Sequence, residues 1–198
     1  MRIIFNINKE ELDMKLIGNA LLASATALLF ASAANAQEYP VGEPVLKDGM
    51  EIVGVYLQPI TMDNEGVEPE HQHRPAKDSD IHLEADIHAL DGNPNGFAEG
   101  DWIPNLNITY NIKKVDGGSN FNHDGHFMMM VASDGPHYGD NVKLDGHGKY
   151  KVTFNISPPN PNQMGRHIDK ETGVGPWFRP FDVSWEFDYS GTGRKGSY

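Results

Sequence analysis

The chain has 198 residues, a formal net charge of −12 and no cysteine. A surface this acidic argues against binding to nucleic acid or to an anionic membrane, and it favours the attraction of cations. The absence of cysteine excludes disulfides, thiolate metal sites and thiol nucleophiles. Any bound metal ion must therefore be held by His, Met, Asp or Glu side chains.

Residues 1–36 predict a cleavable export signal. An apolar run at residues 16–30 leads into Ala34-Asn35-Ala36, which fits the small-x-small cleavage pattern. The run is too short to span a bilayer comfortably and no basic stop follows it, so we expect no direct membrane anchor. Met14 is an alternative start, because the residues before it add mixed charges that such a signal does not need. We therefore expect a periplasmic protein whose residues 37–198 form one domain.

This second part of the chain predicts short strands and no amphipathic helix of useful length. Runs that are β-branched and aromatic, or that alternate apolar and polar residues, are separated by Gly, Pro, Asn and Asp. We expect strands at residues 50–57, 80–90, 106–112, 127–132, 150–156 and 181–189. Six or seven short strands with regular turns predict an all-β fold, an immunoglobulin-like antiparallel β-sandwich.

The predicted strand at residues 80–90 is the main candidate for a metal site. Its alternation places apolar side chains on one face and only carboxylates and imidazoles on the other, namely Asp80, His82, Glu84, Asp86 and His88. These side chains bind borderline and hard metal ions, and residues two apart on a strand lie roughly 6–7 Å apart. A solvated acidic face is the simpler alternative.

Two other regions supply candidate ligands. Met128, Met129 and Met130 alternate along a short apolar strand, and a thioether suits copper, especially the cuprous ion. All three could instead fill the core, where methionine packs adaptably. We expect a stiff Gly-Pro turn to follow and to orient His137. His167 lies in a loop-rich segment, where an exposed histidine is the alternative.

The remaining histidines are expected in loops or turns. The pairs His71-x-His73 and His123-x-x-His126 could hold a metal weakly, and His147 stands alone. We interpret all five as solvated loop residues. Their function is left open.

Sequence signatures of enzymes are mostly absent. The chain has no G-x-S-x-G, H-E-x-x-H or P-loop motif. An acid–base role for His82 and Glu84 remains open but has no further support. Binding is therefore favoured over catalysis.

Several segments together resemble one family, the bacterial periplasmic proteins of high-affinity iron transport. The segments that carry the resemblance are Asp80–Leu90, Gly92–Gly96, Met130–Gly139 and Gly165–Gly175, with agreement at Tyr39–Pro44 and Val55–Pro59. The resemblance covers essentially the whole chain after the signal. It implies an immunoglobulin-like homodimer with a copper site, acting in iron uptake beside an inner-membrane iron permease.

The family's metal ligands correspond here to His82, Glu84, Met130, His137 and His167. Asp134 stands where the family places a nearby carboxylate, which implies a second, iron-type ion. A mixed set of imidazoles, thioether and carboxylate can serve copper in both oxidation states. Whether the ligands come from one copy of the chain or from two stays open.

We therefore expect a periplasmic metal-binding protein with a copper site, serving iron acquisition. Two alternatives remain. One is a redox enzyme in which bound copper interconverts ferrous and ferric iron. The other is a copper-storage or copper-chaperone protein unrelated to iron.

Overall fold

The computed structural model describes residues 37–69 and 72–192. The expected export signal and His71 lie outside these residues. The regular structure of the described residues is β-strand, apart from a short 3-10 turn at Ala76–Asp78. Its strands are β1 Tyr39–Pro40, β2 Val45–Lys47, β3 Met50–Leu57, β4 Ile81–Ala89, β5 Asn107–Lys114, β6 Asn122–His126, β7 Met128–Ala132, β8 Gly135–Val142, β9 Gly148–Ser157 and β10 Phe181–Tyr189.

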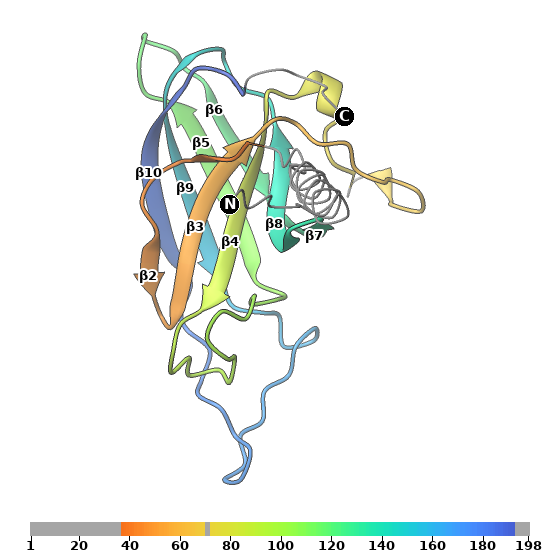
Figure 1. Ribbon diagram of the computed structural model, residues 1–198, viewed down its shortest axis with the longest axis vertical. Coiled ribbons are helices and arrows are strands. Elements are labelled where there is room, and N and C mark those ends of the chain that lie inside the picture. Colours follow the sequence, from red (N-terminus) through yellow and green to blue (C-terminus); the bar gives the residue numbers. More distant parts are fainter. Residues whose placement is uncertain (1–36, 70–71, 193–198) are drawn as a thin grey trace, which may run out of the picture. The chain divides into compact units, whose positions relative to one another are not determined.

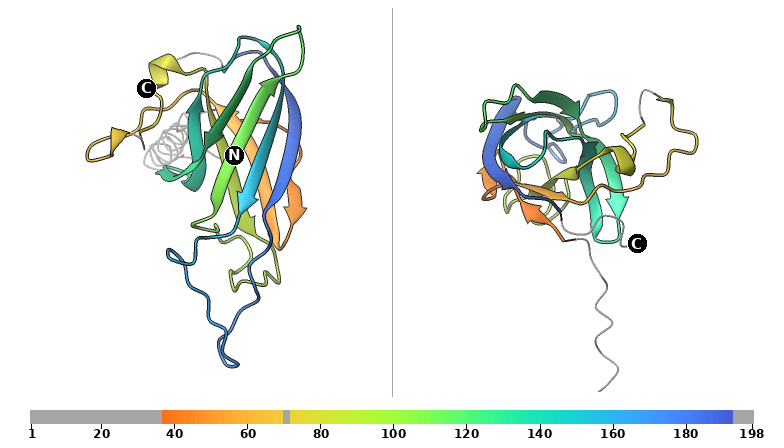
Figure 2. Two further views of the ribbon diagram at one scale, coloured as in Figure 1. Left: turned by 180° about the vertical axis from the view of Figure 1, so that it is seen from behind. Right: turned by 90° about the horizontal axis from the view of Figure 1, so that it is seen from above.

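The strands form two antiparallel sheets that face each other. One sheet has the order β1-β3-β4-β8-β7, with β2 also paired to β3, and the other has the order β10-β9-β5-β6. Figure 1 shows the first sheet in front, and Figure 2 shows the second from behind. The prediction of an all-β immunoglobulin-like sandwich is confirmed, and each of the six strands expected from the sequence is present.

The core lies between the sheets and is built from the apolar alternate residues of each strand. On β4 the core-facing Leu83 and Ala85 are fully buried, and they are met from the other sheet by side chains such as Ile108 and Phe154. Because side chains alternate, this packing forces His82 and Glu84 onto the outer face of the first sheet. The core thereby fixes which way the candidate ligands point.

Three expectations about local structure are wrong. Gly135 and Pro136 do not form a turn but begin β8, because a two-residue connection at Ser133 and Asp134 already reverses the chain between β7 and β8. His123 and His126 lie in β6 rather than in loops. Their polar, glycine-containing strand lacks an apolar face, and it is stabilised by pairing with β5.

Two long connections meet at one end of the sandwich. They join β4 to β5 and β9 to β10, and Figure 1 shows the second of them, in blue, projecting beyond the strands. The Gly175 N–H donates to the Pro94 carbonyl at 2.7 Å, and the Asn95 side-chain amide donates to the Gly175 carbonyl at 3.0 Å. These bonds hold the His167 segment at that end. Nowhere in the described ranges is there a helix long and apolar enough to cross a membrane.

Candidate metal centre

The candidate ligands surround a glycine on the outer face of the first sheet. Strand pairing places His82 opposite Asn141 and Glu84 opposite Gly139, while Met130 lies opposite His137. Residues that oppose each other in an antiparallel pair share a face.

Gly139 lies at the middle of this arrangement, and its lack of a side chain leaves room for the His82 ring. A Cβ atom at Gly139 would lie 2.5 Å from His82 Nε2. Any larger residue would therefore occupy the space over which the ligands converge.

Three of the predicted ligands form one compact cluster. Glu84 Oε1 lies 3.5 Å from His82 Nε2 and 3.3 Å from His137 Nε2. The two imidazole rings are nearly perpendicular, with centroids 6.0 Å apart. Among the described residues this is the one group of three His, Asp or Glu side chains whose ligand atoms all lie within 4.8 Å of one another.

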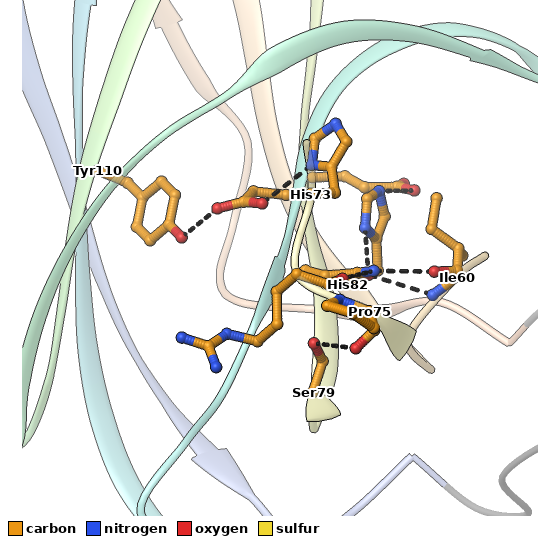
Figure 3. Close-up of polar contacts among 10 residues, drawn as sticks. Ile60, His73, Pro75, Ser79, His82 and Tyr110 are labelled. Atoms are coloured by element: carbon orange, nitrogen blue, oxygen red, sulfur yellow. Dashed lines mark hydrogen bonds and ion pairs between the residues drawn. The ribbon is translucent and has the colours of Figure 1, made fainter. Parts of the chain in front are cut away.

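The His82 ring is fixed by Asn141. The Asn141 amide nitrogen donates to the carbonyls of Ile60 and Arg74, both at 2.8 Å, and its oxygen accepts the Ile60 N–H at 3.2 Å. That oxygen must therefore also accept the hydrogen on His82 Nδ1, 3.0 Å away (Figure 3). The lone pair of neutral His82 is consequently on Nε2, the nitrogen that faces Glu84.

His137 and Met130 complete this side of the cluster. A hydrogen bond with the Gly135 backbone orients the His137 ring. The Nε2 atoms of His82 and His137 are buried, and neither has a hydrogen-bond partner in the part of the chain that the structure describes. Met130 is 8% exposed and lies directly across from His137. Two bare nitrogen lone pairs, a thioether and a carboxylate suit copper in either oxidation state.

Burial sets the protonation of these groups. It lowers the pKa of His82 to about 4, and it also lowers the pKa of His137, so both rings are neutral and ready to bind a metal. Burial, and then the nearby carboxylates of Asp86, Glu38 and Asp134, raises the pKa of Glu84 to about 8. In the metal-free protein Glu84 therefore carries a proton at neutral pH. A metal cation bound by the Glu84 carboxylate would displace this proton.

A small acidic pocket adjoins the cluster. Its volume is about 320 Å³, and its lining includes Glu84 together with Glu38, Asp86, His88 and Asp134. Burial, and then the charge of Glu38, raises the pKa of Asp86 to about 6. So many carboxylates facing one space would repel one another unless they bound protons or a cation. Asp134, the residue predicted to serve a second ion, lines this pocket beside Glu84.

His167 is not brought to the cluster within one copy of the chain. Its side chain is 74% exposed, and its Nδ1 contacts the Thr172 hydroxyl at 2.8 Å. The loop that carries it is held against the β4–β5 connection at the end of the sandwich. His167 can join the other ligands only if a second copy supplies it or if the loop moves.

Sequence reasoning missed three contributors to the site. Asn141 and Gly139 were not singled out, although they sit on alternate positions after His137 and share its face. Recognising residues 135–142 as a strand would have identified both. Glu38 comes from the start of the described chain and is far from the other residues in sequence, so no local pattern could have revealed it.

The fold and the cluster together define a β-sandwich protein with a candidate metal centre made of His, Glu and Met side chains. The family model for Fe2+ transport protein matches residues 35–191, and the chain belongs to that family.

The relatives agree over nearly the whole chain. The UPF0423 protein BAB2_0840 of Brucella abortus is 56% identical over 186 residues, which are 92% of this chain and 98% of the relative. The structure of FetP from uropathogenic Escherichia coli strain F11 superimposes with a TM-score of 0.71 at 55% identity, covering 78% of this chain and 97% of FetP. The structure of copper-reconstituted P19 from Campylobacter jejuni superimposes with a TM-score of 0.72 at 50% identity, covering 80% of this chain and 99% of P19.

Proposed function

We propose that this chain is a periplasmic copper-binding protein of iron uptake. Copper would be held by His82, Glu84, Met130 and His137 above Gly139. The observation that carries the proposal is the pair of buried Nε2 atoms that converge on one carboxylate and have no other partner in the described chain. Burying such groups unpaired is costly, so the site is built to be completed by a cation. Copper bound to P19, a relative with the same fold, supports the choice of metal.

Copper binding by variants tests this assignment. Replacing His82 or Met130 with Ala should weaken copper binding strongly, because each variant removes one of few buried donors. His147→Ala is the matched control, since His147 is exposed. Titration calorimetry with a competing chelator measures the affinities. Unchanged copper affinity in both ligand variants would reject the site.

We propose that a homodimer supplies His167 as a further ligand. The side chains of Ile168, beside His167, and of Val131, on edge strand β7, are 80% and 82% exposed. Apolar side chains this exposed are typical of surfaces that are covered in an assembly. Sedimentation would measure the oligomeric state. Mixing His82→Ala with His167→Ala chains tests the sharing of ligands, because a mixed dimer would regain one complete site.

The acidic pocket supports the link to iron. Hard carboxylate oxygens from Glu38, Asp86 and Asp134 favour a ferrous or ferric ion over cuprous copper. Export of the chain and delivery of iron to an inner-membrane permease belong to the same proposal; FetP, a relative, was expressed in the periplasm. A deletion strain should grow poorly under iron limitation, and a copy carrying Asp134→Asn should restore growth less well than the native copy. Full growth of the deletion strain would reject the role in iron uptake.

The closeness of this pocket to the copper ligands favours a second candidate function, a copper-dependent redox enzyme for iron. Glu84 lines the pocket and also contacts both histidines, so the two ions would share it. Stopped-flow mixing of copper-loaded protein with excess ferrous iron and oxygen separates the two functions. A carrier gives at most one oxidation per copper, whereas an enzyme turns over repeatedly.

A further inference from the structure

A larger cleft lies at the edge of the same sheet, where β7 begins. Its volume is about 1010 Å³, and its lining includes His73, Asp140, Met128 and His126. Its histidines are not among the residues that correspond to the family's ligands. His73 was expected to be a solvated loop residue, but it is 8% exposed, so that prediction is wrong.

His73 is held in the way that metal-binding histidines are commonly held. Its Nδ1 lies 3.0 Å from Asp140 Oδ1, and the Tyr110 hydroxyl donates to Asp140 Oδ2 at 2.7 Å (Figure 3). Burial and the Asp140 charge raise the pKa of Tyr110, so the phenol keeps its proton and Asp140 remains an acceptor. His73 Nδ1 therefore carries the hydrogen that Asp140 accepts. This carboxylate–imidazole pair leaves the lone pair on Nε2.

His73 Nε2 has no partner among the described residues, although it is fully buried. In Figure 3 this nitrogen lies on the side of the labelled His73 ring that has no dashed line. A bare lone pair can bind only a hydrogen-bond donor or a metal ion, so anions and carbonyl groups are excluded as ligands. The pairing of His73 with Asp140 repeats that of His82 with Asn141, and the two supporting residues are neighbours on β8.

Met128 supplies a soft donor to the same cleft. Strand pairing places it directly opposite Gly139, so its side chain lies on the same face as His82. Met128 is partly exposed, and it lines the cleft together with His73. A thioether donates no hydrogen bond, so it adds nothing to a site for a polar organic ligand, but it binds cuprous copper well. His126 is a further imidazole on the cleft wall.

We infer that His73 Nε2 and the Met128 thioether form an accessory site for a cuprous ion, beside the main cluster. The choice of copper rests on the proposed function, whereas the site itself rests on the cleft. The accessory site lies at the strand end next to the main cluster.

Silver(I) is the probe, because it is a redox-inert soft cation and needs no anaerobic handling. Native mass spectrometry counts bound ions, and the imidazole nitrogen resonances in NMR report which histidine binds. The wild-type chain should bind two ions. A main-site double variant, His137→Ala with Met130→Leu, should keep one ion, with a shifted His73 Nε2 resonance.

Adding Met128→Leu to that double variant should weaken the remaining site at least tenfold. This replacement conserves volume and should keep the fold, whereas His73→Ala would remove a buried side chain and its contact with Asp140. Met164→Leu, at a methionine that is not part of the cleft lining, is the matched control and should change nothing.

A single ion in the wild-type chain that is lost in the main-site double variant would overturn the accessory site and leave the main site intact. Silver retained by the double variant with no change at His73 would also overturn it. Two ions that both survive the double variant would contradict the main site instead.

Discussion

Asn141→Ala is the most informative single substitution, because Asn141 links His82, the first proposed copper ligand, to the loop that carries Ile60 and Arg74. The side chain hydrogen-bonds to His82 and to the backbone of Ile60 and Arg74. Removing it leaves the fully buried His82 Nδ1–H without an acceptor, which costs about 1–3 kcal/mol. The freed backbone groups of Ile60 and Arg74 add less, because both residues are at least partly exposed and water can reach them. We expect a total loss of about 2–4 kcal/mol of unfolding free energy.

The same change should weaken copper binding by about 10–100-fold, because the ring loses the partner that fixes its orientation and its Nε2 lone pair. Urea denaturation measures stability, and chelator competition measures copper affinity. Asn155→Ala is the matched control: Asn155 is exposed and donates one hydrogen bond, to Asp182, far from the ligands. A variant that loses stability but binds copper with native affinity would refute the role of Asn141 in orienting His82.

Four further predictions concern the cluster itself. Gly139→Ala should reduce copper affinity at least about tenfold, since its Cβ would lie 2.5 Å from a ligand nitrogen, while Gly165→Ala, which meets no neighbour within 4 Å, should not. Copper binding at pH 7 should release about one proton from Glu84, because the pKa of this carboxyl is raised to about 8. Proton release should vanish above about pH 9 and in Glu84→Gln. Calorimetry in buffers of different ionisation enthalpy measures the number of protons released. Because the pKa of Glu84 is raised, the folded state binds this proton more tightly than the unfolded state does. The metal-free wild type should therefore lose stability relative to Glu84→Gln as the pH rises from about 4.5 to about 8. A difference in unfolding free energy between the two proteins that stays constant over this range would be contrary evidence. Met130→Leu should lower cuprous affinity more than cupric affinity, with Met164→Leu as its control; equal losses would show that the thioether is not a ligand.

Much of the fold could be predicted because apolar alternation is a local property. The pattern around Leu83 and Ala85 gave both the existence of β4 and the direction of His82 and Glu84. β6 and β8 were missed for the opposite reason. Their residues are polar, or include Gly and Pro, and only pairing with a neighbouring strand keeps them extended.

The assembly of the site depended on information that the sequence does not carry locally. Contact of His137 with Glu84 follows from the pairing of β4 with β8, whose partners are about 55 residues apart along the chain. His73 itself lies in the long connection between β3 and β4, and its contact with Asp140 joins residues 67 apart along the chain. No local sequence pattern reveals such a contact. The resemblance to iron-transport proteins supplied the set of expected ligands. Within one copy of the chain, His82, Glu84 and His137 lie together, whereas His167 is exposed and apart from them.

The proposed function requires copper to bind above Gly139, between the two buried imidazoles. An anomalous difference map at the copper edge, from crystals grown with one equivalent of copper, would locate the ion. We expect one strong peak within bonding distance of His82 Nε2 and His137 Nε2, with Met130 alongside. A peak elsewhere, on exposed histidines such as His126 or His147, with none above Gly139, would contradict it.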